Sequence, residues 1–170
     1  EGLLHDAVCD IVGTQFRNLA TVGGSIFGRF GFSDVMTAFL ALDSYVELYK
    51  GGVVPMSEFV KIKRDNDILV RVIVKKQAGH FVYLSHRNTR TDFPVLTVAV
   101  SDCGGVKKAV IGARPGIAKM YEIETMDEET AARLQEETCF QSNMRASETF
   151  RRHLAGVLLR RAFGAVQGKE

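Results

Sequence analysis

The pattern of hydrophobic and polar positions predicts two helices near the start of the chain. The first is expected over residues 2–12, where five apolar side chains share one helical face: Leu3, Leu4, Ala7, Val8 and Ile11. Ser33 is a good N-cap for a second helix that continues to about Leu42. The stretch of residues 17–35, as far as the Ser33 cap, has little periodicity, so a loop is expected there.

Alternating and β-branched runs predict strands through the middle of the chain. Residues 44–49 and 53–55 are expected to form a hairpin around Gly51 and Gly52, followed by a short helical turn capped by Ser57. Further runs rich in β-branched or aromatic residues follow at 68–74, 80–85, 93–101 and 106–113. A Cys-Gly-Gly turn at 103–105 is expected to join the last two of these, and Arg-Pro-Gly at 114–116 to end the last run.

Two further helices are predicted at the end of the chain. Residues 125–140 begin with Thr125 and Glu128 in capping-box spacing, and their sparse apolar positions are typical of a surface helix. Residues 147–166 have a stronger apolar face. Their basic side is either solvated, which is the simpler interpretation, or a docking surface for a partner, and it consists of Arg151, Arg152, Arg160 and Arg161.

This order of elements predicts an α+β fold with a boundary near residues 76–80. The chain has 170 residues and a net charge of +2, from 22 Lys and Arg against 20 Asp and Glu, which is too balanced to indicate nucleic-acid binding. No apolar stretch approaches the length of a membrane span, and no signal peptide is visible. The chain begins with Glu inside a predicted helix, which predicts a fragment or a processed product.

The cysteines and histidines predict no metal centre in this chain. Cys9, Cys103 and Cys139 are far apart, which argues against a disulfide framework, a zinc site or an iron–sulfur cluster. They are expected to be mostly buried thiols in a reducing compartment, the cytoplasm. None of the four histidines lies at metal-ligand spacing from another, so structural roles are expected for them.

A glycine-rich turn carries the strongest candidate chemistry. Gly23 and Gly24 lie between Thr21 and Ser25, so backbone N–H groups and hydroxyls could together hold a diphosphate. Asp34, which only accepts hydrogen bonds when it is ionised, would suit sugar hydroxyls. A plain turn with capping hydroxyls explains the same residues, and taken alone it is the simpler interpretation.

Several stretches of the sequence, taken together in their order along the chain, favour a binding site over a plain turn. The segment from Gly13 to Ser25, followed by Ser33, Asp34 and an apolar helix, resembles the second half of the FAD-binding domain in molybdenum hydroxylases. This family includes the FAD-binding (medium) subunits of xanthine dehydrogenase and carbon monoxide dehydrogenase. Its pattern runs Gln-Ile-Arg-Asn-x-Ala-Thr-Ile-Gly-Gly-Asn, followed by Pro-x-x-Asp or Pro-x-Ser-Asp. Further matches in the same order are GGVVPMSEFV, ILVRVIV, SHRNTRTDFPVLTVAV and FRRHLAGVLLRRAF.

The resemblance implies both a domain organisation and a function. Residues 1–78 would form the second lobe of a two-lobed FAD-binding domain, and residues 79–170 a small C-terminal domain with an antiparallel sheet packed by helices. The chain would relay electrons from iron–sulfur clusters on a partner subunit through FAD to an acceptor such as NAD. Molybdopterin and the 2Fe-2S clusters are expected on partner subunits only, and no catalytic residue or metal ligand on this chain.

The resemblance also implies the residues that bind the cofactor. Thr21, Gly23, Gly24 and Ser25 would contact the diphosphate region of FAD, Asp34 a sugar or ribityl hydroxyl, and Leu69 would lie near the flavin. The chain departs from the family pattern at several positions. Ser25 replaces the usual Asn, Gly31 the usual Pro, Arg29 and Phe30 a pair of small residues, and Leu84 a Lys near the flavin that many members have.

A second lobe normally precedes these residues in the family, with an Ala-Gly-Gly-Thr-Asp type of loop that holds the other side of the diphosphate. No such loop occurs in this sequence. The 170-residue chain alone is therefore expected to bind FAD weakly or not at all, and to be inactive. The alternative function is a truncated or degenerate homologue that acts as a non-catalytic scaffold or interaction module. A flavoenzyme outside the molybdenum group is disfavoured by the match of the C-terminal domain.

Overall fold

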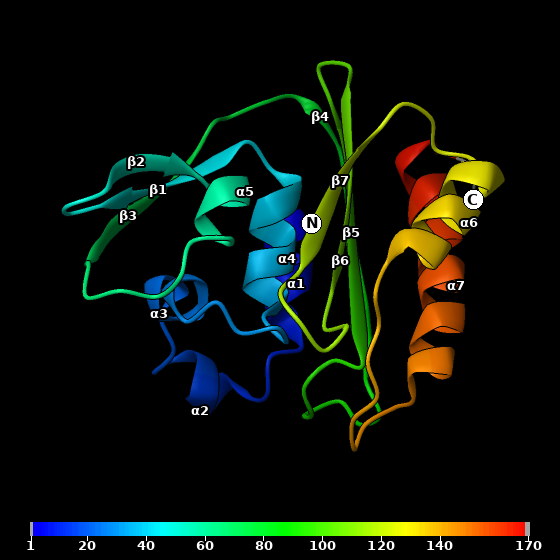
Figure 1. The fold of residues 1–170 in the computed structure, drawn as a ribbon, viewed down its shortest axis with the longest axis horizontal. Helices are drawn as coiled ribbons and strands as arrows, with labels where there is room; N and C mark the ends of the chain where they lie inside the picture. The colour runs from blue at the N-terminus through cyan, green and yellow to red at the C-terminus, as the bar shows by residue number, and fades with distance from the viewer. Residues whose placement is uncertain (1, 169–170) are drawn as a thin grey trace.

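The computed structural model describes residues 2–168 and is built around a four-stranded antiparallel sheet. Its strands lie in the order β4 (Gly79–His86), β5 (Leu96–Cys103), β6 (Val106–Gly112) and β7 (Lys119–Ile123). Helices cover both faces of the sheet (Figure 1). One face packs against α1 (Leu3–Cys9) and α4 (Asp34–Ala41), and the other against α6 (Glu128–Glu137) and α7 (Glu148–Val166).

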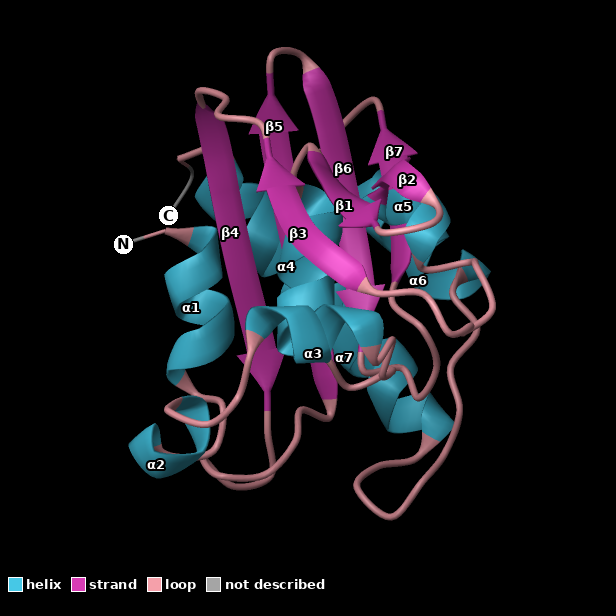
Figure 2. Cartoon of the chain, turned by 90° about the vertical axis from the view of Figure 1, so that its left-hand side faces the viewer, coloured by secondary structure: helices cyan, strands magenta, loops and turns pink. Residues whose placement is uncertain are grey.

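A smaller sheet lies on the far side of α4 from the large one (Figures 1 and 2). Its order is β2 (Gly52–Pro55), β1 (Ser44–Leu48) and β3 (Leu69–Val74), all antiparallel. Three short helices belong to the same half of the chain: α2 (Thr14–Arg17), α3 (Val22–Phe27) and α5 (Met56–Phe59). Of these, α3 contacts β3, and α5 contacts β1 and β2. The mixture of helices with two antiparallel sheets confirms the predicted α+β class.

The large sheet separates two hydrophobic clusters. One cluster joins α1, α4, α5 and the small sheet to Tyr83, Ala99 and Val110 of the large sheet. The other lies between the opposite face of the large sheet and helices α6 and α7. Strand β5 is buried along almost its whole length because both of its faces are covered. The first cluster therefore crosses residue 78, the expected boundary between the domains.

The long periodic elements lie where the sequence predicts them. Ser33 caps α4 and accepts a hydrogen bond from the Met36 amide at 3.1 Å, and Ser147 caps α7 in the same way. The expectation of a loop over the 17–35 stretch is wrong, because this segment contains α3, and helix α2 just before it was not predicted. Both helices are too short to produce a periodic pattern.

Two predicted helix caps also differ from the structure, and one strand was not predicted. Helix α5 begins at Met56 after Pro55 and has no side-chain cap, so Ser57 lies inside the helix. Helix α6 is capped by Asp127, not by Thr125, because the Asp127 carboxylate accepts the Thr130 amide at 2.8 Å. Strand β6 ends at Gly112, just before the Arg-Pro-Gly turn as predicted, but a further strand, β7, follows that turn and was not predicted.

Two predictions about burial also need correction. Cys9 and Cys139 are exposed, and only Cys103 is buried. Arg151, expected on the basic side of its helix, is fully buried. Within residues 2–168 no helix is long and apolar enough to cross a membrane, and no group of His, Cys, Asp and Glu could hold a metal ion.

Candidate functional site

Thr21 starts α3 and shapes the glycine turn. Its Oγ1 accepts a hydrogen bond from the Gly24 amide at 3.0 Å, while the Ser25 hydroxyl donates to the Thr21 carbonyl oxygen at 3.1 Å. A Cβ at position 24 would lie 2.9 Å from Thr21 Oγ1, so a glycine is needed there. The Thr21 hydroxyl hydrogen is not used by this cap and can be donated to a ligand.

The first turn of α3 presents further donors. Val22 and Gly23 are the first two residues of the helix, so their amide hydrogens have no acceptor within it. Leu69 of β3 packs beneath this turn: a Cβ built on Gly23 would lie 3.8 Å from Leu69 Cδ2, an ordinary contact distance. The turn therefore rests on the small sheet while its N–H groups stay available.

A cavity of about 340 Å³ opens where the starts of α3 and α4 meet the loop after β4. Its polar lining includes Thr21, Ser25, Asp34, Arg87 and Asp92, and its aromatic lining is Phe16, Phe30, Phe32 and Phe93. An apolar cavity with a few convergent polar groups is the usual form of a small-molecule site.

Phenylalanine rings form one wall of the cavity. Phe30 and Phe32 stack with their centroids 5.2 Å apart, and Phe32 and Phe93 are 4.3 Å apart. Each of the three residues remains 40–46% exposed. The Arg145 guanidinium lies over Phe93, 5.2 Å from its centroid. Such a wall suits a planar aromatic group, because rings favour offset or edge-to-face contacts.

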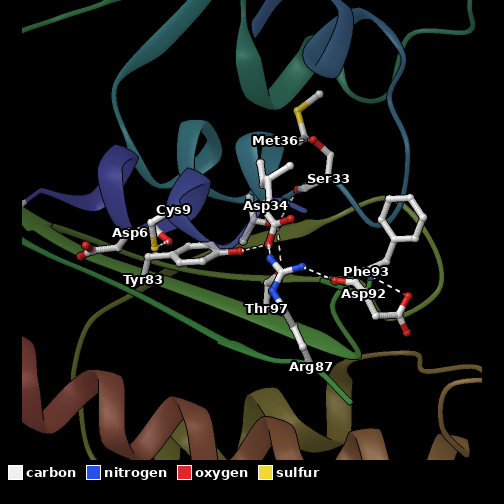
Figure 3. A network of polar contacts seen from close by, with 12 residues as sticks. Asp6, Cys9, Ser33, Asp34, Met36, Tyr83, Arg87, Asp92, Phe93 and Thr97 are labelled. Atoms are coloured by element: carbon white, nitrogen blue, oxygen red, sulfur yellow. Dashed lines mark hydrogen bonds and ion pairs between the residues drawn. The ribbon is translucent and has the colours of Figure 1, made fainter. Parts of the chain in front are cut away.

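Asp34 lies at the centre of a polar network (Figure 3). Its Oδ1 accepts hydrogen bonds from the Tyr83 hydroxyl and from Arg87 Nη2, both at 2.5 Å. Burial raises the pKa of Asp34, and these two hydrogen bonds oppose the rise because they favour the carboxylate. Burial, followed by the nearby Asp34 charge, holds the pKa of Tyr83 well above its ordinary value. Tyr83 is therefore a neutral donor.

Arg87 links this network to the loop that follows β4. Its Nη1 donates to the Asp92 carbonyl oxygen at 2.8 Å, and its Nε is buried without a hydrogen-bond partner. The Asp92 carboxylate binds Arg145 at 2.8 Å, and this interaction lowers the pKa of Asp92. The cavity floor is thus fixed by charged groups from α4, the β4–β5 loop and the segment before α7.

The structure brings together four of the six residues expected to bind cofactor. Thr21, Gly24, Ser25 and Asp34 all line the cavity. Gly23 and Leu69 do not line it; Leu69 Cδ2 lies 3.8 Å from the place that a Cβ on Gly23 would take.

Sequence reasoning did not single out several residues of the site. They are Tyr83, which bonds Asp34 from behind the cavity lining, and the lining residues Phe32, Arg87, Asp92 and Phe93. Arg87, Asp92 and Phe93 lie within the SHRNTRTDFPVLTVAV stretch that resembles the family, and this is the signal that could have found them.

These groups fit part of a ligand that carries both phosphates and an aromatic ring. The Thr21 hydroxyl and the amides of Val22 and Gly23 supply donors for anionic oxygens, and the phenylalanine wall supplies an apolar surface. The cavity volume of about 340 Å³ is at the low end for ligand sites. The residues of this chain therefore fit one portion of FAD, without enclosing the whole molecule.

Comparison with known proteins finds a family match in the N-terminal part of the chain. The family described as "FAD binding domain in molybdopterin dehydrogenase" matches residues 2–76. The uncharacterized protein YgfM of Escherichia coli strain K12 is 24% identical over 161 residues, which are 92% of this chain. The chain spans 62% of the length of that protein.

Solved structures share the fold over nearly the whole chain. Quinoline 2-oxidoreductase from Pseudomonas putida 86 has a TM-score of 0.79 at 20% identity, over 96% of this chain and 66% of that one. Carbon monoxide dehydrogenase from Hydrogenophaga pseudoflava, in a form lacking the Mo-pyranopterin moiety, has a TM-score of 0.82 at 18% identity. That match covers 98% of this chain and 67% of the other.

Proposed function

Because residues 2–76 match the family described as FAD binding domain in molybdopterin dehydrogenase, we propose that this chain is part of the FAD-binding subunit of a molybdenum hydroxylase. The observation that carries the proposal lies within the matched residues. One cavity is lined both by residues at the start of α3 (Thr21, Gly24 and Ser25) and by Asp34 at the start of α4.

The chain's own residues would bind and orient the cofactor. The amides and hydroxyls of Thr21–Ser25 would hold the diphosphate, and Asp34 would accept a hydrogen bond from a sugar or ribityl hydroxyl. Leu69 would support the turn from below through Gly23 and lie near the flavin. FAD supplies the redox chemistry when it is bound, whereas the protein supplies orientation and electrostatics. No general acid or base on this chain is required.

The assembly that we propose is a xanthine dehydrogenase-like complex in the cytoplasm. Partner subunits would carry the molybdopterin and the 2Fe-2S clusters, and NAD is the proposed final acceptor. Residues 1–78 would be the second lobe of the FAD-binding domain and residues 79–170 the small C-terminal domain. A complementary lobe would complete the FAD site, which accords with a chain that spans 62% of the length of its E. coli relative.

Flavin content and its reduction in the assembled complex test this function. We expect the purified complex to contain stoichiometric FAD, and its flavin absorbance to bleach when the substrate of the molybdenum subunit is added. A complex that assembles without flavin would contradict the proposal and favour the scaffold. The 170-residue chain alone is expected to bind FAD weakly or not at all, and a tight stoichiometric complex of that chain would contradict this expectation.

A further inference from the structure

The two carboxylate oxygens of Asp34 have different surroundings. Oδ1 accepts the hydrogen bonds from both Tyr83 and Arg87. Oδ2 accepts none from another described residue. It is nevertheless not a buried unpartnered atom, because among residues 2–168 the one buried side-chain nitrogen or oxygen without a hydrogen-bond partner is Arg87 Nε. Oδ2 is therefore not enclosed, and it can be reached from the cavity that Asp34 lines.

We propose that Tyr83 and Arg87 are positioning residues that hold Oδ1 of Asp34 and keep its Oδ2 free, as a carboxylate, to accept a hydrogen bond from a ligand hydroxyl. The inference rests on the proposed function only for the identity of the ligand. Neither residue is assigned a role by the family resemblance, and both lie beyond residues 2–76.

Burial explains why Asp34 needs two partners. The side chains of Asp34 and Arg87 are only 6% and 7% exposed, so an isolated carboxylate at this position would tend to take up a proton. Burial does raise the pKa of Asp34, while the hydrogen bonds from Tyr83 and Arg87 lower it. A protonated Asp34 is a poorer acceptor, so these donors would extend ligand binding to lower pH.

Few other ionisable groups face this site. Asp6 and Cys9 of α1 lie beside the Tyr83 ring (Figure 3). The Asp92 carboxylate is paired with Arg145, and Arg87 contacts the Asp92 carbonyl oxygen. Helix α4 itself carries Asp34 as its only charged residue. Asp34 is therefore the group whose protonation the proposal concerns.

The test compares Tyr83→Phe and Arg87→Lys with the unchanged chain in two measurements. The first follows the ¹³C shift of the Asp34 carboxyl carbon against pH in the 170-residue chain without ligand. We expect the midpoint to move to higher pH in Tyr83→Phe, which keeps the ring and removes only the donor. The second measures the dissociation constant of FAD against pH in the assembled complex. We expect the variants to bind FAD about tenfold more weakly than the unchanged complex near neutral pH. We also expect their binding to be lost at a higher pH as the solution is made more acidic.

Matched controls separate positioning from general damage to the structure. Tyr45→Phe removes a hydroxyl that bonds Lys75 away from the cavity, and Arg90→Lys alters an exposed arginine in the same loop as Arg87. Neither control should move the Asp34 midpoint. An unchanged midpoint in Tyr83→Phe overturns the inference, whatever the FAD result. If the Asp34 midpoint shifts in Tyr83→Phe but the unchanged complex binds no FAD, the positioning role is supported. The proposed function is then contradicted.

Discussion

Arg151 shows how one side chain can join separate segments of this fold. It is 1% exposed, and its guanidinium donates to the carbonyl oxygens of Val95, Gln141 and Ala146 and to Asn143 Oδ1, at 2.6–2.9 Å. These acceptors come from the start of β5 and from the loop before α7. No carboxylate is among them, so the cation is held by neutral oxygens alone.

Replacing Arg151 should therefore destabilise the fold strongly. Arg151→Met would leave several buried carbonyl groups unpaired, and we expect a loss of about 3 kcal/mol in the free energy of unfolding. Arg151→Lys should recover only part of this, because an ammonium cannot reproduce the planar set of donors. Urea unfolding measures both variants, and exposed Arg161→Met is the control. A loss equal to that of the control would contradict this role.

Asp92 and Arg145 predict a change in stability with pH. Arg145 lowers the pKa of Asp92 in the folded chain, so the pair stabilises the fold above the ordinary Asp pKa, and this contribution is lost as the pH falls through the folded pKa. The difference in unfolding free energy between the unchanged chain and Arg145→Met should therefore shrink below about pH 4. With Asp92→Asn present in both, the difference should not vary with pH over this range. A pH-independent difference without Asp92→Asn would contradict the linkage.

At the scale of elements, the sequence predicts those parts whose burial is periodic. Helices α4 and α7 and the β1–β2 hairpin follow from apolar spacing, Ser caps and the Gly51–Gly52 turn. Helices α2 and α3 could not be found this way, because four to six residues do not complete a periodic pattern. Strand β7 was missed because its residues are mostly half-buried or exposed at a sheet edge.

The same limit applies to the candidate site. The glycine turn and Asp34 are contiguous motifs that a family pattern can carry. Tyr83 and Arg87 join them only because β4 runs past the start of α4, a pairing over about fifty residues that no local pattern encodes. The sequence predicted Arg151 on an exposed basic side for a related reason. The oxygens that accept its hydrogen bonds lie outside its own helix, so the apolar spacing of the helix does not reveal its burial.

The two glycines of α3 are expected to respond differently to substitution by alanine. A Cβ at Gly24 would lie 2.9 Å from Thr21 Oγ1 and displace the cap, whereas a Cβ at Gly23 meets only Leu69 at 3.8 Å. Loss of an N-cap costs about 1 kcal/mol, and Gly→Ala inside a helix gains a similar amount. We therefore expect Gly23→Ala to be about 1 kcal/mol more stable than Gly24→Ala in thermal unfolding. Equal stabilities would show that the cap does not hold α3.

On the scale of the whole molecule, the large sheet makes the two proposed domains interdependent. Its one face packs on α1 and α4 from residues 1–78, and its other face on α6 and α7. Gly31 adds a backbone contact across the same boundary, since its carbonyl oxygen accepts the Ala113 amide at 2.9 Å. A Cβ at Gly31 would lie 2.6 Å from the Gly116 carbonyl oxygen, which explains why no larger residue stands there.

This shared sheet predicts a single cooperative unfolding transition. Far-UV circular dichroism and tyrosine fluorescence should give coincident urea curves, because neither unit can keep its core when the other unfolds. Two separated transitions would instead show that residues 1–78 and 79–170 fold independently.

The central claim is that the glycine turn and Asp34 form one side of an FAD site, and the FAD content of the assembled complex tests it most directly. We predict stoichiometric FAD in the unchanged complex and at least tenfold weaker binding when this chain carries Asp34→Ala, with the subunits still assembled. An Asp34→Ala complex that retains FAD with unchanged affinity would contradict the claim.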